Sequence, residues 1–341
     1  MKIALDAMGG DLAPGAAVHG AVWAARDFDI SIQLVGQPDT IKAELAKHDT
    51  SGLDLPIIAA SEVIEMDEDP AAAVKSKKDA SMVVALRLVK EKESDAFVTA
   101  GNTGGALASA LFGLGRIKGV KRPALGTIFP TMDEKGFSFL LDVGANTDVR
   151  TEFLVQFAIM GSLYAEHVLG IPSPKVALLS TGEEEKKGSL LIKEVTPLLK
   201  QSKLNFVGNV EGKDIPTGAA DVIVTDGFTG NVYIKGVQGA AWIMQKMLER
   251  EIKARPMAML GAFLARGAIK SFRAKVDYRE FGGGPLLGVN GVVIVAHGRS
   301  DAYAIRHAIR VAKQAAENKF IEAIGREFQE IAPVNGAARV R

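Results

Sequence analysis

Amide, hydroxyl and glycine residues follow one apolar run of the sequence in the pattern Thr99-Ala100-Gly101-Asn102-Thr103-Gly104-Gly105. Glycines at the carboxyl end of a strand let backbone N–H groups approach an oxyanion at the start of a helix. The side chains of Asn102 and Thr103 would add hydrogen-bond donors. The segment is therefore a candidate anion site in which Gly101 and Gly104 allow close backbone approach. The alternative is a structural turn with Thr103 as the helix N-cap.

A second glycine pair, Gly9 and Gly10, follows the first apolar run of the chain. Its backbone amides could also bind an anion, and Pro14 suits the first turn of a helix. The alternative is a tight strand-to-helix turn capped by Asp11. Asp6 and Asp11 favour this structural interpretation, because carboxylates are poor neighbours for phosphate.

Lysine and serine side chains are concentrated between these segments, in Val74-Lys75-Ser76-Lys77-Lys78-Asp79-Ala80-Ser81-Met82. Lysine ammonium groups stabilise phosphate as point charges, and serine hydroxyls can donate hydrogen bonds to it. Lys75, Lys77 and Ser81 are therefore candidate phosphate ligands. The alternative is a solvated helix face, which is the common role of a charged run.

Further polar segments follow apolar runs later in the chain. Asp142-Val143-Gly144-Ala145-Asn146-Thr147 carries Asn146 as a candidate donor, and Thr181-Gly182-Glu183-Glu184-Glu185-Lys186-Lys187-Gly188-Ser189 carries Lys186 as a candidate cation. The latter is not a nucleotide P-loop, because Lys187 stands where the second glycine should be. ATP binding through that motif is therefore excluded. His297 follows another apolar run and could accept or donate a proton.

Other motifs of known chemistry are absent from the sequence. There is no Gly-x-Gly-x-x-Gly, no His-Glu-x-x-His, no Gly-x-Ser-x-Gly and no cluster with metal-ligand spacing. The lack of cysteine excludes disulfides, thiolate metal sites and a cysteine-bound acyl intermediate, and is compatible with a reducing compartment. The net charge of +1 argues against a generally basic nucleic-acid-binding protein.

Short apolar runs alternate with longer helical patterns along the chain, which is typical of α/β proteins. Strands are predicted at residues 2–5, 32–35, 57–59, 96–99, 125–129, 137–142, 175–179, 205–208, 222–225 and 292–296. Helices are predicted at residues 15–25, 71–91, 105–114, 152–169, 190–198, 231–254 and 301–326. We expect a single interwoven domain over residues 1–341, with two lobes around a cleft and a lobe boundary near residue 100.

A basic and apolar stretch over residues 252–276 contains no acidic residue. Its basic residues are Lys253, Arg255, Arg266, Lys270, Arg273 and Lys275, and its uncharged centre carries Met257, Met259, Leu260, Phe263 and Leu264. A helical hairpin of this kind is too short to span a bilayer, but it can lie in the interface of an anionic membrane or bind an acidic partner. The alternative is a helix pair packed in a dimer interface.

In this order and spacing, the motifs resemble those of the PlsX family of bacterial phosphate acyltransferases, which act on acyl-acyl carrier protein. The resemblance runs nearly end to end. The segments that carry it are Asp6-Ala7-Met8-Gly9-Gly10-Asp11, Thr99-Ala100-Gly101-Asn102-Thr103-Gly104, Gly144-Ala145-Asn146, Gly182-Glu183-Glu184, Asp226-Gly227-Phe228-Thr229-Gly230-Asn231, Gly283-Gly284-Pro285-Leu286-Leu287-Gly288-Val289 and His297-Gly298-Arg299-Ser300. The segment Lys77-Lys78-Asp79-Ala80-Ser81 departs from the family pattern, which carries more serines.

The resemblance implies reversible transfer of a fatty acyl group from acyl-acyl carrier protein to inorganic phosphate, giving acyl phosphate for phospholipid synthesis. It implies a three-layer α/β/α sandwich with a mixed, mostly parallel sheet, similar to isopropylmalate dehydrogenases and phosphotransacetylases, and no metal or organic cofactor. It also implies a cytoplasmic homodimer that associates peripherally with the inner face of the cell membrane through an apolar hairpin. Its product would pass to a membrane glycerol-3-phosphate acyltransferase.

Motif position within this resemblance assigns roles to individual residues. The predicted catalytic residues are Asn102, Lys186, Asp226, Asn231 and His297, of which His297 or Asp226 would manage the proton of the leaving thiol. The predicted phosphate or substrate ligands are Gly9, Gly10, Lys75, Lys77, Ser81, Gly101, Thr103, Gly104 and Asn146. The predicted membrane or carrier-protein contacts are Arg255, Met257, Leu260, Phe263, Leu264, Arg266 and Lys270. Lys118, Lys121 and Arg122 are further candidates for docking an acidic carrier protein.

Three other functions remain open from the sequence. A phosphotransacetylase that uses coenzyme A would share the fold and the chemistry. A decarboxylating dehydrogenase is disfavoured, because its metal-binding aspartate cluster and nucleotide loop are not evident. A catalytically silent membrane scaffold is disfavoured by the polar residues gathered at several strand ends.

Overall fold

The computed structural model describes residues 1–331, apart from the side chains of residues 273–276, 278 and 331. The strands are β1 (Lys2–Asp6), β2 (Ser31–Gly36), β3 (Ile57–Ala59), β4 (Ala96–Thr99), β5 (Ala124–Pro130), β6 (Phe137–Leu141), β7 (Val176–Ser180), β8 (Phe206–Glu211), β9 (Val222–Val224), β10 (Gly283–Leu287) and β11 (Val292–Ala296). The helices are α1 (Gly15–Phe28), α2 (Pro38–Leu45), α3 (Pro70–Ser76), α4 (Ser81–Lys90), α5 (Thr103–Gly113), α6 (Thr151–His167), α7 (Leu190–Lys200), α8 (Gly227–Lys253), α9 (Pro256–Leu264), α10 (Arg266–Val276), α11 (Ala302–Glu317) and α12 (Phe320–Ile331). Two short 3-10 helices are η1 (Ile215–Thr217) and η2 (Tyr278–Phe281).

The strands form one 11-stranded sheet in the order β3-β2-β1-β4-β11-β10-β5-β6-β9-β7-β8. β1 to β4 and β11 are parallel, and we call the part built on them the first lobe. β6, β9, β7 and β8 form a second parallel group, and with β5 they build the second lobe. The groups are separated by the antiparallel pairs β11/β10, β10/β5 and β5/β6. Three reversals make the two groups run in opposite directions.

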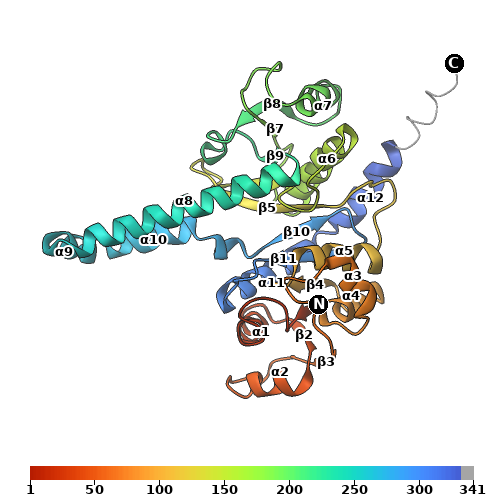
Figure 1. The fold of residues 1–341 in the computed structure, drawn as a ribbon, viewed down its shortest axis with the longest axis vertical. Coiled ribbons are helices and arrows are strands. Elements are labelled where there is room, and N and C mark those ends of the chain that lie inside the picture. Colours follow the sequence, from red (N-terminus) through yellow and green to blue (C-terminus); the bar gives the residue numbers. More distant parts are fainter. Residues whose placement is uncertain (332–341) are drawn as a thin grey trace.

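Helices cover both faces of the sheet (Figure 1). On one face, α1, α6, α7, α11 and α12 share a continuous core with alternate strand residues of both lobes. On the other face, α3, α4 and α5 cover the first lobe, while Tyr233, Ile234 and Val237 of α8 pack over the second. The predicted three-layer sandwich with a mixed, mostly parallel sheet is therefore confirmed.

The strand β10 is absent from the sequence-based prediction, because Gly283-Gly284-Pro285 is typical of a turn or an edge strand. A Cβ on Gly284 would clash with the carbonyl oxygen of Gly126 in β5, so this interior strand needs glycine where the two backbones approach. β10 also returns the chain to the first lobe.

The chain first passes from the first lobe to the second after α5, which ends at Gly113, rather than near residue 100.

Two predicted helices are divided in the structure, and α2 is missing from the prediction. The helix predicted over 71–91 is α3 and α4, because Ala80 is extended and the backbone N–H of Ser81 donates to the carbonyl of Glu62 at 3.0 Å. The helix predicted over 301–326 is α11 and α12, since Lys319 between them has a left-handed φ of 48°. The break between α3 and α4 therefore involves a partner distant in sequence, whereas the break between α11 and α12 lies at a local change of backbone conformation.

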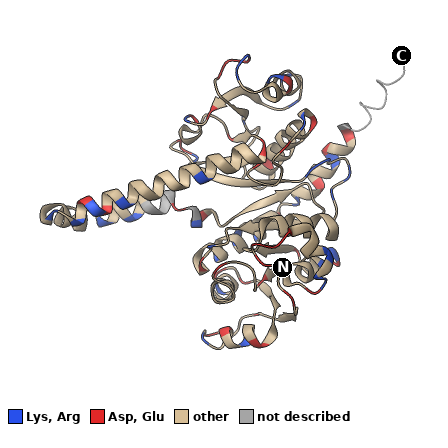
Figure 2. Ribbon diagram, viewed as in Figure 1, with Lys and Arg blue, Asp and Glu red and all other residues tan. Residues whose placement is uncertain are grey.

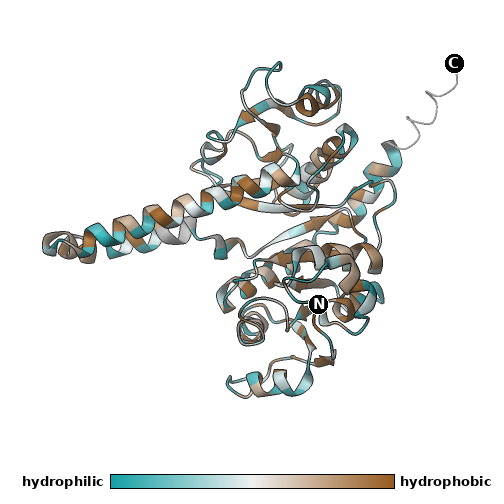
Figure 3. Ribbon diagram, in the orientation of Figure 1, coloured by the Kyte–Doolittle hydropathy of each residue, from teal (hydrophilic) through white to brown (hydrophobic). Residues whose placement is uncertain are grey.

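Helix α8 extends beyond the body of the molecule; α9 lies at its far end, and α10 returns from there toward the body (Figure 1). We call residues 240–276 the projection; it contains the stretch 252–276. Helix α9 has no buried residue, and Met257, Leu260, Phe263 and Leu264 are all more than half exposed. Figure 3 shows strongly hydrophobic turns along the projection, far from the core. The apolar side chains of this hairpin therefore do not contribute to the core of the chain.

Gly20 lies where α1 crosses α11, and a Cβ there would be 2.7 Å from both the carbonyl oxygen of Ala302 and the side chain of Ile305. The variant Gly20→Ala should therefore lower the free energy of unfolding by about 1–3 kcal/mol through overpacking. Urea unfolding followed by circular dichroism measures this change.

Gly239→Ala is the matched control, because Gly239 is also helical but a Cβ there would meet no atom within 4 Å. Alanine favours a helix over glycine by about 1 kcal/mol, so this variant should not lose stability. Equal losses in both variants would contradict the close crossing of α1 and α11.

Candidate active site

The carboxylate of Asp6 lies buried at the end of β1 and joins three elements of the first lobe. It accepts hydrogen bonds from the hydroxyl of Ser81 at the start of α4 (2.6 Å) and from the hydroxyl of Thr99 at the end of β4 (2.8 Å). Burial raises the pKa of Asp6, and these donors oppose the rise. The hydroxyl of Ser81, a predicted phosphate ligand, therefore donates its hydrogen bond to Asp6 in this structure.

Glycine loops after β1, β4 and β11 converge beside Asp6. A Cβ on Gly9 would clash with the Asp6 carboxylate and lie 2.8 Å from the backbone nitrogen of Gly101. Gly10 has a φ of 105°, and the next residue, Asp11, donates its N–H to the carbonyl of Gly298 at 2.7 Å. Three segments distant in sequence therefore pack backbone against backbone, and glycine is needed at positions 9 and 10 because no side chain fits there.

The side chain of Asn102 organises the loop that precedes α3. Its carbonyl oxygen accepts from the N–H of Gly105 (3.0 Å), so Asn102 rather than Thr103 is the N-cap of α5. Its amide nitrogen donates to the carbonyls of Glu65 (3.1 Å), Met66 (3.1 Å) and Glu68 (3.3 Å). Asn102 thereby holds residues 65–68 over the start of α5. Its predicted role toward substrate stays a prediction, and Thr103 beside it is exposed.

The predicted phosphate-binding lysines are dispersed. Lys77 donates to the carbonyl of Val63 and to the Glu68 carboxylate, each at 2.7 Å, and this contact lowers the pKa of Glu68. The ammonium of Lys75 lies 5.7 Å from the centre of the Phe112 ring. Lys186 is exposed in the loop after β7 in the second lobe. The structure therefore does not bring Lys186 together with Lys75 and Lys77 through any contact of the described residues.

A second buried carboxylate, Asp142, follows β6 and organises the second lobe. It accepts hydrogen bonds from the backbone N–H groups of Leu125, Gly144, Ala145 and Asn146 and from the amide of Asn146. Burial raises the pKa of Asp142 and these donors oppose the rise. Every partner is an N–H group, which cannot accept a hydrogen bond from a protonated carboxyl, so these contacts favour the ionised carboxylate of Asp142.

The first turn of α8 packs on the loop that Asp142 organises. The backbone N–H of Gly227 donates to the carbonyl of Asn146 at 2.7 Å, and the amide of Asn231 donates to the carbonyl of Val143 at 2.9 Å. Asp226 is the N-cap of α8 and accepts from the backbone and hydroxyl of Thr229. The predicted residues Asn146, Asp226 and Asn231 are thus brought together at one end of α8.

The same helix reaches the first lobe two turns later, because the amide of Gln238 lies 3.5 Å from the ring nitrogen Nε2 of His297. Partial burial of the His297 ring lowers its pKa, and the positive charges of Arg299 and Lys235 lower it further. His297 is therefore neutral near pH 7 and able to accept a proton. Helix α8 connects the strand-end loops of both lobes, which the opposite strand directions would otherwise separate.

Sequence reasoning missed the roles of Asp6, Asp142 and Gln238. The two aspartates share a detectable signal, since each ends an apolar run and is followed within three residues by glycine. Gln238 gave no signal, because its contact with His297 joins residues 59 apart in the chain.

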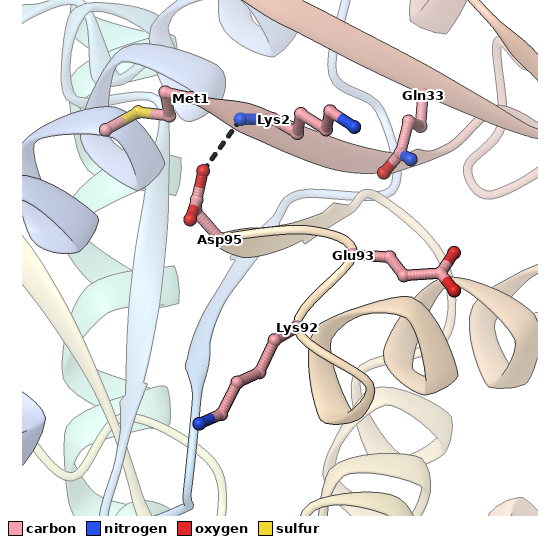
Figure 4. Close-up of a pocket in the computed structure, with 6 residues that line it drawn as sticks. All are labelled: Met1, Lys2, Gln33, Lys92, Glu93 and Asp95. Carbon is pink, nitrogen blue, oxygen red and sulfur yellow. Dashed lines mark hydrogen bonds between the residues drawn. The ribbon is translucent and has the colours of Figure 1, made fainter.

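One hollow in the surface lies at the opposite ends of the strands from Asp6. Figure 4 shows it lined by Met1, Lys2, Gln33, Lys92, Glu93 and Asp95. The backbone N–H of Lys2 donates to Asp95 at 2.7 Å across it. Its mixed charges and its distance in the fold from every predicted site residue make it a poor candidate. Among residues 1–331, the structure also contains no cluster of three or more side chains suited to a metal ion.

Comparison with known proteins identifies the family. A family model described as "Fatty acid synthesis protein" matches residues 1–323. A phosphate acyltransferase of Heliobacterium modesticaldum is 53% identical over 95% of this chain and 96% of its own length. One of Desulfitobacterium hafniense is 52% identical over 96% of this chain and 98% of its own. The chain belongs to the phosphate acyltransferase family. The resemblance inferred from the sequence motifs is therefore confirmed.

Solved structures outside this family share its fold. A phosphotransacetylase from Streptococcus pyogenes has a TM-score of 0.62 and 18% identity, covering 93% of this chain and 94% of its own. A phosphotransacetylase from Staphylococcus aureus has a TM-score of 0.59 and 17% identity with the same coverage. At this identity the likeness places the family in a fold class and carries no assignment of substrate.

The variant Ser81→Ala should lower the free energy of unfolding by about 1–3 kcal/mol, because it leaves the buried Asp6 carboxylate without one of its donors. Urea unfolding measures the loss. Ser76→Ala is the matched control, since the hydroxyl of Ser76 bonds only to carbonyls of its own helix and the change should be within about 0.5 kcal/mol. Equal stabilities of both variants would contradict the structural role of Ser81.

Proposed function

We propose that the chain transfers a fatty acyl group from acyl-acyl carrier protein to inorganic phosphate, forming acyl phosphate. The observation that carries this function is the match to phosphate acyltransferases over nearly the whole chain, at 53% identity with one of them. The converging glycine loops and the absence of cysteine fit direct transfer without a covalent enzyme intermediate. The product would supply an acyltransferase of phospholipid synthesis.

The reaction needs positioning more than activation, because the thioester is already an activated acyl donor. A phosphate oxygen attacks the thioester carbonyl carbon, and a C–O bond forms as the carbonyl becomes an oxyanion. Backbone N–H groups of the glycine loops stabilise that oxyanion. The C–S bond then breaks, and the carrier thiolate takes up the proton that hydrogen phosphate loses. No metal or organic cofactor is needed for these steps.

We propose that His297, rather than Asp226, moves that proton. The Asp226 carboxylate is bonded to the first turn of α8, whereas the lowered pKa of His297 leaves its ring neutral and able to accept a proton near pH 7. Asn146 and Asn231 are proposed to position substrate from the second lobe. Asn102 is proposed to act on substrate only if the 65–68 loop releases its amide.

Docking of the carrier protein is proposed at basic residues between the lobes. Carrier proteins of this class are acidic, so complementary charge would guide their binding. Lys118, Lys121 and Arg122 lie in the connection between α5 and β5; Lys121 is 4.0 Å from Glu152, and Arg122 lies over the Phe153 ring. The candidate docking residues therefore sit on the segment that joins the two lobes.

The projection is proposed to bind an anionic membrane peripherally, at the inner face of the cell membrane. The contact residues are Arg255, Met257, Leu260, Phe263, Leu264, Arg266 and Lys270. Figure 2 shows basic residues along the same helices. Arg255 pairs with Glu251 at 2.6 Å, so its positive charge has an acidic partner just outside the stretch 252–276. No helix described in residues 1–331 has the length and apolarity to span a bilayer.

Exposed Trp242, Met244 and Leu248 on α8 support a homodimer through this helix.

The purified chain, incubated with palmitoyl-acyl carrier protein and inorganic phosphate without added metal, should release carrier thiol and form hydroxylamine-trappable acyl phosphate in equal amounts. Both products should depend on phosphate. Acetyl-coenzyme A is the comparison donor and should react much more slowly. Faster reaction with acetyl-coenzyme A would instead favour the phosphotransacetylase function, and no product from either donor would favour a membrane scaffold.

The variant Leu260→Glu should lose most of its flotation with vesicles that contain phosphatidylglycerol, because it places a carboxylate in the apolar face of α9. Leu190→Glu is the matched control, since Leu190 is 73% exposed on the body of the molecule, and it should float like the wild type. Unchanged flotation of Leu260→Glu would remove the membrane assignment.

A further inference from the structure

One face of α8 spans the gap between the strand-end loops of the two lobes. Asn231, Lys235 and Gln238 are spaced i, i+4 and i+7, so they lie on the same side of the helix. Asn231 bonds the carbonyl of Val143 in the second lobe, and Gln238 contacts His297 in the first. Helix geometry therefore places Lys235 between these two contacts.

Lys235 belongs to a cluster of basic side chains that we define as Lys235, Arg299 and the neutral ring of His297. Gln238 lies among them: its amide nitrogen is 3.5 Å from His297 Nε2, and its oxygen accepts from Arg299 at 3.5 Å. One acidic side chain near this loop is Asp11, whose carboxylate would lie 3.4 Å from a Cβ on Gly298. Lys235 makes no ion pair with an acidic side chain in the part of the chain that the structure describes. Its charge is available to a ligand.

The cluster adjoins the backbone of the glycine loops. Gly298 separates His297 from Arg299, and its carbonyl accepts the N–H of Asp11 next to Gly10. A group held by the cluster would therefore lie beside the loops where the thioester carbonyl is proposed to react. Lys77, by contrast, is neutralised by Glu68.

We propose that Lys235, together with Arg299, forms the anion subsite that binds a phosphate group of the substrates. This inference rests on the proposed function. The group is either inorganic phosphate or the phosphodiester of the carrier protein's pantetheine arm, which present the same anionic oxygens. Lysine and arginine side chains are suited to both.

The state of His297 supports this assignment and provides a direct readout. In the free protein, burial lowers the pKa of His297, and the positive charges of Arg299 and Lys235 lower it further. A bound phosphate dianion offsets these charges and favours the imidazolium. Phosphate binding at the cluster should therefore raise the pKa of His297.

The test compares wild type with Lys235→Gln, Lys235→Arg and the control Lys246→Gln, a lysine of the same helix that pairs with Glu249 in the projection at 3.5 Å. In assays without vesicles, Lys235→Gln should raise one Michaelis constant roughly tenfold, as expected for loss of a charge-assisted contact. Lys235→Arg should recover most of the loss, and Lys246→Gln should match wild type.

Two arms distinguish the source of the bound group. If it is inorganic phosphate, the KM for phosphate rises in Lys235→Gln while the KM for palmitoyl-acyl carrier protein stays the same. If it is the phosphodiester, wild type prefers palmitoyl-phosphopantetheine to palmitoyl-pantetheine and Lys235→Gln loses that preference. Unchanged values in both arms would overturn the proposal.

A binding measurement separates this inference from the catalytic function. Proton NMR of the histidine rings, with His297 assigned from the His297→Gln variant, gives its pKa with and without inorganic phosphate or phosphopantetheine. One of these ligands should raise the pKa in wild type and in Lys246→Gln, but much less in Lys235→Gln. This result would hold even if no acyl phosphate were formed. An equal rise in all variants, or none in wild type, would overturn the assignment of Lys235.

Discussion

Burial of a carboxylate at the end of a central strand is the constraint from which the site is built. A buried carboxylate is tolerated only where hydrogen-bond donors surround it. For Asp6 these donors come from Ser81 and Thr99, which belong to α4 and β4. The break between α3 and α4 puts Ser81 at the start of α4, where its hydroxyl reaches Asp6. The same carboxylate leaves room only for glycine at position 9. One buried carboxyl group thus sets the relative positions of three strand-end loops.

Asp142 has the corresponding role in the second lobe, but its donors are backbone and amide N–H groups of its own loop and of β5. The loop that it orders receives the first turn of α8. Because the two parallel strand groups run in opposite directions, strand ends alone would not form one site. Helix α8 makes the connection through Asn231 and Gln238, and it places Lys235 between them. The arrangement suits a reaction whose main demand is to hold two anionic substrates beside each other.

The same helix continues without a break from Asp142's loop to the projection. Residues near its start contact the second lobe, residues in its middle contact His297, and most of its residues after Gly239 are exposed. A continuous helix keeps its two ends in a fixed relative direction, since its hydrogen-bonded backbone resists bending. The helix therefore fixes the direction of the projection relative to the site.

The sequence by itself determined the fold class, the family and the membership of most strands, because apolar runs such as 96–99 and 292–296 are buried on both faces and end in recognisable glycine motifs. It also located Asn102, Asn231 and His297 in those motifs. Only the tertiary structure decided what each side chain contacts: Asn102 holds the 65–68 loop, Ser81 serves Asp6, and Lys77 pairs with Glu68. It also revealed β10, whose Gly-Gly-Pro start predicts a turn. The physical reason is common to all these cases: local pattern encodes burial and backbone preference, whereas hydrogen-bond partners and close backbone approaches are made between residues far apart in the chain.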